Sequence, residues 1–489
     1  MAHPPTDEQQ HAIDLARSGE SLVLQALAGT GKTQTLAFIG EAMPDKRFQY
    51  VAFNKSIVTD AAGRFTSNVE PRTAHSLAHT GVVKGTGYAK RLQGGGRVSP
   101  MDLARMLNTR EMIVTTPFGA KRLAAGWLAS LATRTVQIFC QTADVKIGPW
   151  HVPRQDGLDE PTADGRRGPV MSEVAAHVAM LAQKMWDDIA KPTGAMPFEH
   201  GHYLKLWSLN DPRINADVLL LDESQDLNPC MLSIAKNQVN AQLIVVGDSQ
   251  QAIYSWNGAV DALDKFDIAN VAWLTQTFRF GPAIAEVANE VLAQLGTPMR
   301  LSGFEARESA VTAVRDGRRT ILGRTNGLVV REALSAIRRG VRAHVVGGAK
   351  DVISFAEAAK KLKAGSVTYH HDLACFSTWA EVQDYVDSDP LGEDLRLMVR
   401  LVDEFGEDAL IGELKNQSKP EHADLICSTA HKSKGLQFER VQIGSDFTDP
   451  EKKEISDEEK RLTYVAVTRA MQELDVADVP LLNQKKETA

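Results

Sequence analysis

The segment from Leu22 to Thr33 constrains the fold of this chain more than any other part of the sequence. It begins with an apolar run typical of a buried strand, passes through a loop of small residues, and reaches Gly31-Lys32-Thr33 at the start of an apolar-periodic helix. Glycines let backbone N–H groups wrap around phosphate oxygens, and a helix N-terminus adds positive potential there. The segment therefore predicts a phosphate-binding loop at the carboxyl end of a parallel strand in an α/β domain.

Individual residues of this loop have predictable tasks in binding a nucleotide. Lys32 is expected to reach the outer phosphates, and the Thr33 hydroxyl to ligate Mg²⁺. Ala26 stands where the strict pattern has its first glycine, so the match is incomplete, and a glycine-rich turn with an incidental lysine is the alternative. The residues expected to line the nucleotide phosphates are Ala28, Gly29, Thr30, Gly31, Lys32, Thr33 and Gln34.

A second hydrophobic run ends in two adjacent carboxylates, Asp222 and Glu223. Two carboxylates on a surface turn are usually only solvated, but carboxylates that follow a buried strand favour magnesium chemistry. Asp222 is expected to hold the metal, and Glu223 to accept a proton from the attacking water.

Strand-like apolar runs occur in two separate sets, which predicts two doubly wound α/β domains with parallel sheets. We expect residues 1–81 and 211–285 to form the first domain, and residues 286–347 and 424–489 to form the second. Helical periodicity predicts a helical insertion in each domain. The first covers residues 82–210, and the second, which is shorter, covers residues 348–423.

Composition excludes several classes of protein. No apolar stretch approaches the roughly 20 residues that cross a bilayer. The first residues lack a signal-peptide pattern, so we expect a cytoplasmic protein with no membrane partner. Four cysteines without a CxxC pair disfavour a zinc ribbon or a disulfide framework. A net charge of −7 argues against coating nucleic acid by bulk electrostatics, so nucleic acid must bind in a local groove.

Further motifs follow one another along the chain, and their order is the specific signal. In this order they resemble the motifs of the UvrD/Rep-type helicases of superfamily 1, over nearly the whole chain. The resemblance implies two RecA-like P-loop motor domains that hydrolyse ATP with Mg²⁺ and move 3′→5′ along single-stranded DNA. The motifs are Asp7–Gln10, Phe53–Lys55, Thr73–Ser76, Asp222–Asp226, Val246–Ala259, Thr275–Phe280, Ser428–Phe438 and Arg461–Ala470.

The resemblance also assigns nucleotide contacts. Gln9 corresponds to the glutamine that reads adenine, and Phe278 to the aromatic residue that stacks on it. Gln251 corresponds to the sensor of the γ-phosphate. Arg279 and Arg469 correspond to two arginines that touch the transferring phosphoryl group. Arginines in that role contribute about 10³–10⁵ in rate.

The DNA contacts that the resemblance implies lie in both motor domains. Tyr254 and Trp256 correspond to rings that stack on bases, and they follow closely after Gln251. A segment with a phosphate sensor and stacking rings can convert nucleotide state into strand grip, since each stack is worth roughly 1–3 kcal/mol. Core packing is the alternative for such a pair of rings. The residues expected to contact DNA are Phe53, Asn54, Lys55, Thr73, His75, Tyr254, Trp256, Asn257, Thr429 and His431.

Two residues depart from the family pattern. Asn257 stands where many relatives have an arginine, which predicts weaker strand grip at that point. Gln437 replaces the glutamate of the usual KGLEF motif, so it keeps an acceptor for a sugar hydroxyl of the nucleotide but loses the charge. Neither change touches the residues assigned to ATP hydrolysis.

Within the family, the string Ala52–Ile57, the compact second insertion and the segment Thr463–Arg469 resemble the F-box DNA helicase branch. We expect no F-box ahead of the motor, because the adenine motif begins at residue 7, so a ubiquitin-ligase role is not implied. The implied partners are single-stranded DNA, DNA junctions with a 3′ single-stranded tail, and recombinase filaments or a partner protein. The implied setting is repair, recombination or replication, with the chain acting as a monomer.

Three other functions stay open on the sequence. The first is a DNA-stimulated ATPase that strips proteins from single strands without unwinding duplex. The second is an ATP-switched subunit of a larger complex. The third is a P-loop kinase for a small molecule, which shares the phosphate loop but leaves Tyr254, Trp256 and the second domain without a task.

Overall fold

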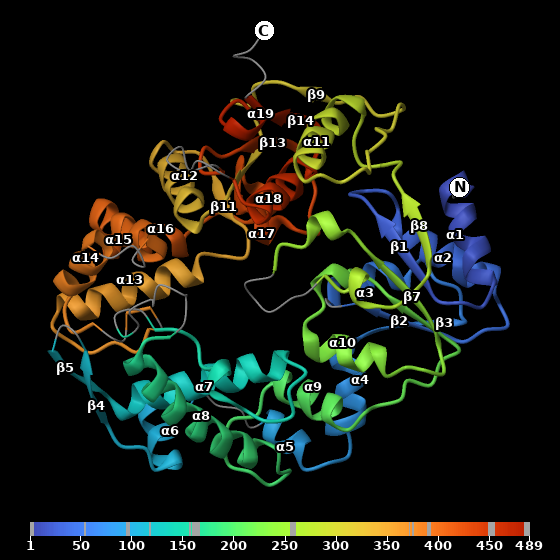
Figure 1. Cartoon of the computed structure of the whole chain (residues 1–489). Helices are drawn as coiled ribbons and strands as arrows, with labels where there is room; N and C mark the ends of the chain where they lie inside the picture. Colours follow the sequence, from blue (N-terminus) through green and yellow to red (C-terminus); the bar gives the residue numbers. More distant parts are fainter. Residues whose placement is uncertain are drawn as a thin grey trace.

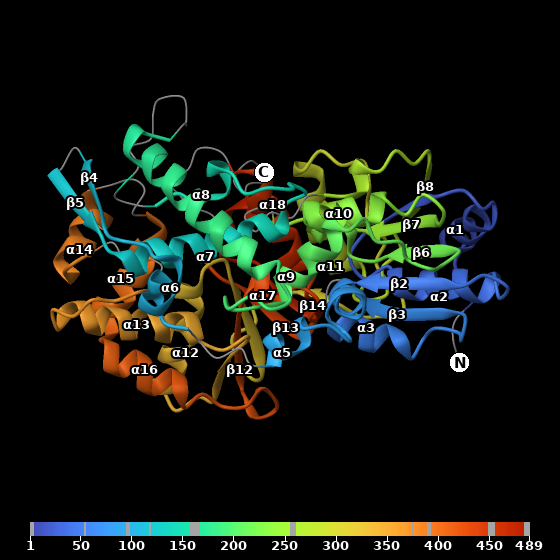
Figure 2. The same cartoon turned by 90° about the horizontal axis from the view of Figure 1, so that it is seen from below.

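The computed structural model describes residues 4–52, 55–93, 98–116, 119–155, 158, 167–254, 261–370, 372–373, 376–388, 393–447 and 455–483. Four residues expected to contact DNA lie outside these ranges, namely Phe53, Asn54, Trp256 and Asn257. Figures 1 and 2 show the chain from two directions. In the part of the chain described here, no helix has the length and apolar character needed to span a membrane.

The first sheet has six parallel strands in the order β3-β2-β6-β7-β1-β8. Strand β6 (Val218–Leu221) is buried at every position, because helices cover both faces of such a sheet. Its other strands are β1 (Leu22–Ala26), β2 (Phe48–Ala52), β3 (Val69–Thr73), β7 (Gln242–Gly247) and β8 (Asn270–Leu274). The helices of the same stretches are α1 (Asp7–Arg17), α2 (Lys32–Ala42), α3 (Lys55–Ala62) and α10 (Pro229–Lys236).

The second sheet also has six parallel strands, in the order β11-β12-β10-β13-β14-β9. Two parallel sheets flanked by helices confirm the predicted fold class (Figure 1). The strands are β9 (Ala310–Val311), β10 (Arg319–Gly323), β11 (Ala343–Val345), β12 (Leu425–Thr429), β13 (Phe438–Ile443) and β14 (Ala470–Asp475). The helices are α11 (Pro282–Gln294), α12 (Asn326–Arg338), α17 (Ala430–Ser433), α18 (Asp457–Val467) and α19 (Pro480–Asn483).

Between β3 and β6 the chain is mostly helical, but it also contains an antiparallel hairpin that the helical pattern did not predict. The hairpin pairs β4 (Met112–Thr116) with β5 (Gly119–Leu123). The helices are α4 (Ala74–Ala78), the π-helix η1 (His79–Val83), α5 (Tyr88–Gln93), α6 (Pro100–Leu107), α7 (Ala125–Gln141), the 3₁₀ turn η2 (Pro149–His151), α8 (Pro169–Ile189) and α9 (His200–Leu209).

A second helical region lies between β11 and β12. Figures 1 and 2 place it beside the hairpin, and the Lys121 ammonium lies 5.9 Å from the centre of the Phe376 ring. The two helical regions therefore meet. The helices of this region are α13 (Lys350–Lys363), α14 (Trp379–Ser388), α15 (Glu393–Phe405) and α16 (Glu407–Lys415).

One buried cluster joins the two sheets. It includes Leu27 and Ala28 from the loop after β1, together with Tyr464 from α18 and Ile443 from β13. Apolar side chains from both halves pack there because each would otherwise be exposed to water. The loop after β1 is thereby held against the second sheet, and the candidate site lies at this junction.

Candidate active site

The loop after β1 has the backbone of a phosphate cradle. Gly29 and Gly31 have φ values of 76° and 80°, in the left-handed region that favours glycine. A Cβ atom added to Gly29 would lie 2.5 Å from Thr277 Oγ1 and 2.7 Å from Arg279 Cβ, so only glycine fits. Gly31 caps α2 without a side-chain hydrogen bond. The first N–H groups of α2 are therefore available to an anion.

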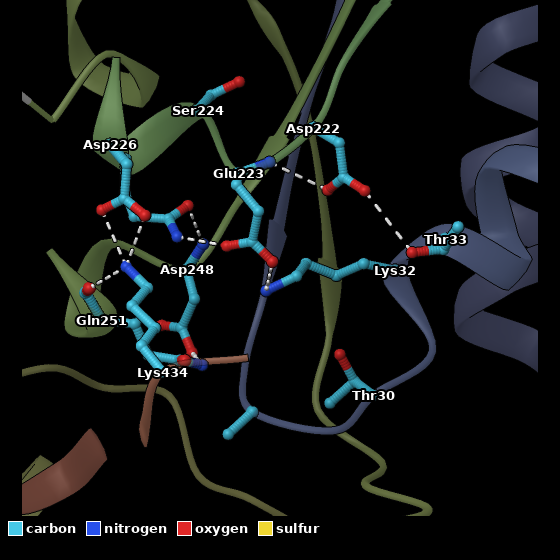
Figure 3. Close-up of polar contacts among 12 residues, drawn as sticks. Thr30, Lys32, Thr33, Asp222, Glu223, Ser224, Asp226, Asp248, Gln251 and Lys434 are labelled. Carbon is cyan, nitrogen blue, oxygen red and sulfur yellow. Dashed lines mark hydrogen bonds and ion pairs between the residues drawn. The ribbon is translucent and has the colours of Figure 1, made fainter. Parts of the chain in front are cut away.

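The two predicted carboxylates lie beside this loop at the carboxyl end of β6 (Figure 3). Asp222 Oδ2 accepts a hydrogen bond from the Tyr50 hydroxyl at 2.7 Å and one from Thr33 Oγ1 at 3.4 Å. Glu223 Oε1 lies 3.6 Å from Lys32 Nζ. The structure thus brings together the four residues that the sequence pattern alone assigned to phosphate, metal and proton transfer.

The protonation states within this group are set by burial and by the neighbouring charges. Burial opposes the charged form of both Lys32 and Glu223, but the pair stabilise each other. The pKa of Lys32 is raised, and Lys32 and Lys434 together lower the pKa of Glu223 to about 2. Burial and the Glu223 charge raise the pKa of Asp222. Glu223 is therefore an ionised carboxylate that can accept a proton.

Thr33 and Asp222 also fit a magnesium ion. Mg²⁺ prefers hard oxygen ligands and usually takes one or two from the protein, leaving the rest to phosphate and water. The Thr33 hydroxyl and the Asp222 carboxylate supply this kind of donor set at one point. Among the described residues no group of three or more His, Cys, Asp or Glu side chains could cage a metal.

A chain of hydrogen bonds leads from Glu223 to the second half of the molecule. Gln225 Nε2 donates to Glu223 Oε2 at 2.5 Å, and Gln225 Oε1 accepts from the Asp248 N–H at 3.1 Å. Gln251 Nε2 donates to Asp248 Oδ2 at 2.6 Å. Arg469 Nη2 then donates to Gln251 Oε1 at 3.1 Å. The predicted phosphate sensor, Gln251, therefore lies between the Asp248 carboxylate and the predicted arginine, Arg469.

Both predicted arginines lie at the junction of the two halves. Arg469, just before β14, is 1% exposed, and its Nε donates to Val465 O at 2.9 Å. Arg279 Nη1 donates to Thr468 O at 2.8 Å. Burial, together with the charge of Arg279, lowers the pKa of Arg469 to about 9. Arg279 is half-buried. Two guanidinium groups near each other, one of them fully buried, favour an anion between them.

The other end of the loop brings together Gln9 and Phe278, the two residues assigned to the adenine base. Gln9 Oε1 accepts from the Thr6 N–H and Gln9 Nε2 donates to Thr35 Oγ1, both at 3.0 Å. The side-chain amide of Gln9 keeps one further acceptor site on Oε1 and one further N–H on Nε2. This pair matches the N6 and N7 edge of adenine. A Cβ atom on Gly31 would lie 3.3 Å from Gln9 Nε2 and 3.7 Å from the Phe278 ring. Gln9 and Phe278 thus flank the start of α2.

Lys434 ties the second half to the segment that carries Tyr254, a role that sequence reasoning missed. Its Nζ lies 2.6 Å from Asp226 Oδ2 and donates to Gln251 O at 2.6 Å. The same ammonium lies 5.1 Å from the centre of the Tyr254 ring, and the Tyr254 hydroxyl donates to His431 O at 2.9 Å. The available signal was a second lysine in the Ser428–Phe438 motif, but its partner lies 208 residues away.

Three further contacts were also missed. The Tyr464 hydroxyl accepts from the Ala28 N–H at 3.1 Å, across the junction of the two halves. Glu8 accepts from the Thr275 N–H at 2.8 Å and so links α1 to the segment that carries Phe278. Tyr50 bonds Asp222, as described above. Each pair is distant in sequence, so only the folded chain reveals it.

Four of the described DNA-contact candidates share one local structure, although β3 is an edge strand and β12 lies inside its sheet. Thr73 and Thr429 each cap a short helix that follows a parallel strand, and each side chain accepts a backbone hydrogen bond from three residues later. His75 and His431 follow two positions after these threonines and are half-buried. Burial lowers the pKa of both imidazoles. The structure thus gives the two Thr-Ala-His segments the same local conformation after β3 and β12.

Three other predicted residues are exposed or half-buried. Lys55 is exposed at the start of α3, and Gln34 is half-buried in the first turn of α2. Gln437 is exposed between α17 and β13, and both of its neighbours bond Arg469. Leu436 O accepts from Arg469 Nη1 at 3.3 Å, and the Phe438 N–H donates to Arg469 O at 2.9 Å.

Known proteins match this chain along most of its length. A family model described as an AAA domain matches residues 9–257, and one described as the UvrD-like helicase C-terminal domain matches residues 375–477. F-box DNA helicase 1 of Gallus gallus is 28% identical over 95% of this chain and 48% of its own length. F-box DNA helicase protein 1 of Schizosaccharomyces pombe is 28% identical over 97% of this chain and 57% of its own.

ATP-dependent DNA helicase UvrD2 of Mycobacterium tuberculosis is 27% identical over 51% of this chain and 46% of its own length. The chain thus spans about half the length of the curated relatives it matches. The first family model covers half of the chain, and the matches agree with the motif order and with the two parallel sheets. The chain belongs to the UvrD-like helicases of superfamily 1.

Proposed function

We propose that this chain is an ATP-dependent DNA helicase and single-strand translocase whose ATP site is divided between the two sheets. The observation that carries the proposal is the hydrogen-bond chain from Glu223 through Gln225, Asp248 and Gln251 to Arg469. It connects the candidate base on the first sheet to a buried arginine on the second. The names of the relatives, all DNA helicases, support DNA as the substrate.

In this proposal the first half binds ATP and the second half completes the reaction. The N–H groups at the start of α2 and the Lys32 ammonium hold the phosphates. Glu223 accepts the proton of the attacking water, and Arg279 and Arg469 offset the charge on the transferring phosphoryl group. Thr33 and Asp222 would hold Mg²⁺, which supplies further positive charge to the phosphates.

Coupling to DNA uses the short path from Gln251 to Tyr254. Lys434 contacts Gln251 O, Asp226 and the face of the Tyr254 ring, so a change at the γ-phosphate reaches a base-stacking side chain within three residues. The strand contacts proposed on the first half are Lys55, Thr73, His75 and Tyr254. Those on the second half are Thr429 and His431. Phe53, Asn54, Trp256 and Asn257 complete the set by resemblance.

The finer assignments follow the family. We assign 3′→5′ movement, single strands and junctions with a 3′ tail as substrates, and a setting in repair, recombination or replication. Recombinase filaments are the protein obstacle that the F-box helicase relationship favours. A monomer is sufficient, because both halves of the ATP site lie in one chain.

Protein displacement without unwinding is the second candidate. It is favoured by the compact region between β11 and β12, which has only four α-helices among its described residues, and by Asn257 in the sequence. A strand-separation assay run beside a filament-displacement assay distinguishes the two. Activity in the second assay alone selects displacement.

The proposal is tested by the ATPase rate with single-stranded DNA, duplex DNA or RNA, for wild type and Lys32→Ala. We expect single-stranded DNA to stimulate most, and Lys32→Ala to be inactive because the phosphates lose their cation. A Lys32→Ala protein with wild-type turnover contradicts the ATP site. Turnover that no nucleic acid stimulates contradicts the DNA-dependent motor.

A further inference from the structure

The turn between α7 and α8 presents a tryptophan to solvent. Trp150, in the 3₁₀ turn η2, is 68% exposed and is the most exposed aromatic side chain in the described part of the chain. An exposed indole leaves a large apolar surface in water, which folding alone does not favour. The neighbouring contacts hold the ring in place, which indicates a binding role for Trp150.

The indole ring is held in one orientation. Its Nε1 donates to Asp144 Oδ2 at 2.8 Å. A Cβ atom added to Gly148 would lie 2.3–2.5 Å from three carbons of the ring, so one face of the indole rests on the Gly148 backbone. The ring is thus in contact with Gly148 on one face and hydrogen-bonded to Asp144 at its edge. Such a ring loses little conformational entropy when a ligand stacks on it.

The turn itself is fixed to the protein on several sides. His151 is buried, and its Nδ1 accepts from the Gly148 N–H at 2.9 Å. Lys205 Nζ donates to Thr142 O at 2.7 Å and to Asp144 O at 2.6 Å. Arg167 donates to the carbonyl groups of residues 149 and 152. The position of Trp150 therefore follows the position of α9, which carries Lys205.

Helix α9 also contacts the candidate DNA segment of the first half. Tyr203, two residues before Lys205, packs its ring edge-on at 6.0 Å from His75 and 5.8 Å from His79. One helix therefore holds the Trp150 turn at one point and the His75 segment at another. Because Tyr203 and Lys205 are two residues apart, they extend from different sides of α9, so this helix lies between the His75 segment and the Trp150 turn.

The charges around the ring suit a nucleic acid. Lys146 and Arg154 are exposed on either side of Trp150 in sequence, and Arg167 lies against the turn. Among the described residues, the acidic group that contacts the ring is Asp144, which accepts from the indole N–H and lies 3.1 Å from His151 Nε2. Aromatic rings among cations are the arrangement that binds single strands without sequence preference.

We infer that Trp150 is a stacking platform for an unpaired base of single-stranded DNA, with Lys146, Arg154 and Arg167 near the flanking phosphates. The inference rests on the proposed DNA-dependent motor and extends its strand path onto the helical region between β3 and β6. The base stacks on the open face of the indole, while Gly148 supports the other face.

The test measures the affinity for a labelled oligothymidylate of wild type, Trp150→Ala and Trp273→Ala. Trp273, on edge strand β8, is 46% exposed and serves as a matched control. We expect Trp150→Ala to bind about 5- to 150-fold more weakly, which corresponds to one lost stack. Trp273→Ala should bind like wild type, and Trp150→Tyr should keep most of the affinity. Melting temperatures check that each variant is folded.

Two further measurements separate stacking from other causes. On an abasic strand, which has phosphates but no bases, wild type and Trp150→Ala should bind equally. Gly148→Ala keeps the indole but pushes it from its support, so it should also weaken binding to the oligothymidylate.

Equal affinity of Trp150→Ala and Trp273→Ala for the oligothymidylate overturns the inference, and so does an equal loss on the abasic strand. If Trp150 serves a protein partner instead, the DNA affinity stays unchanged. A wild-type chain that binds no DNA contradicts the proposed function rather than this platform.

Discussion

In each sheet one strand is followed by a loop and a helix, β1 by α2 and β10 by α12. The N-termini of these two helices are capped differently. After β1, Gly31 caps α2 without a side-chain bond, and Lys32 follows directly. After β10, Thr325 caps α12 with its own hydroxyl. There the Asp446 carboxylate also accepts from the backbone N–H groups of Arg324 at 2.8 Å and Thr325 at 2.9 Å.

In the proposed function, this difference explains why one half would bind the nucleotide and the other half would supply the residues that complete its site. A helix N-terminus attracts an anion by default, and in the second half a carboxylate of the protein takes that place. In the first half no side chain caps the N-terminus of α2, and the Lys32 ammonium adds a positive charge there. The second half instead contributes side chains that reach across the junction, namely Arg469, Tyr464 and Lys434.

Of changes at Glu223, Asp226 and Asp446, the largest effect is expected at Glu223, the candidate base of the open half. Glu223→Gln keeps the shape of the side chain but cannot accept a proton, so turnover should fall by about 10²–10⁴. Glu473→Gln, which removes a carboxylate paired with Arg440 in the second sheet, is the control. Steady-state ATPase assays with single-stranded DNA measure both. Similar rates in the two variants would place the base elsewhere.

A smaller effect is expected from pH, through the contact of Lys434 with Asp226. Burial raises the pKa of Asp226 to about 6 even though Lys434 opposes the shift. Because this value lies above the ordinary one, protonation favours the folded state as pH falls, but it removes the charge that pairs with Lys434. DNA-stimulated turnover should therefore fall about tenfold for each unit below pH 6.

Asp226→Asn tests this assignment, because it has no proton to gain. It should show the low-pH rate at every pH, and its pH profile should be flat between about pH 5 and 7.5. An inflection near pH 6 that persists in Asp226→Asn contradicts the role given to this pair.

The smallest effect on activity is expected from the capped half. Asp446→Ala leaves two backbone N–H groups at α12 without their carboxylate, which should cost about 0.5–2 kcal/mol of folding free energy. Asp446 lies outside the ATP site, so turnover per folded molecule should stay at the wild-type level. Urea unfolding and ATPase assays measure the two quantities. A large loss of turnover at full stability would mean that this helix also serves the nucleotide.

The sequence alone could predict the residues that lie in local strand-end patterns. Lys32, Thr33, Asp222 and Glu223 were predictable because strand-end loops obey local rules of glycine, charge and helix start. The two-sheet fold followed from two sets of apolar runs. Gln251 and the arginines were placed only through family resemblance, because a single glutamine or arginine has no local signature.

The remaining contacts depend on packing that no local pattern reveals. Lys434 and Asp226 are separated by 208 residues, and the hydrogen bond from Ala28 to Tyr464 spans 436. The β4–β5 hairpin was missed because its short strands lie in a stretch dominated by helical periodicity. Such features follow from how the two halves dock.

Arg469→Ala shows whether the second half is needed for hydrolysis but not for nucleotide binding. Nucleotide affinity and the single-turnover rate with DNA should be measured together, with Arg342→Ala, an exposed arginine of the same half, as the control. We expect affinity within about tenfold of wild type and a rate lowered by about 10³–10⁵. Hydrolysis by Arg469→Ala at the wild-type rate would contradict the divided ATP site.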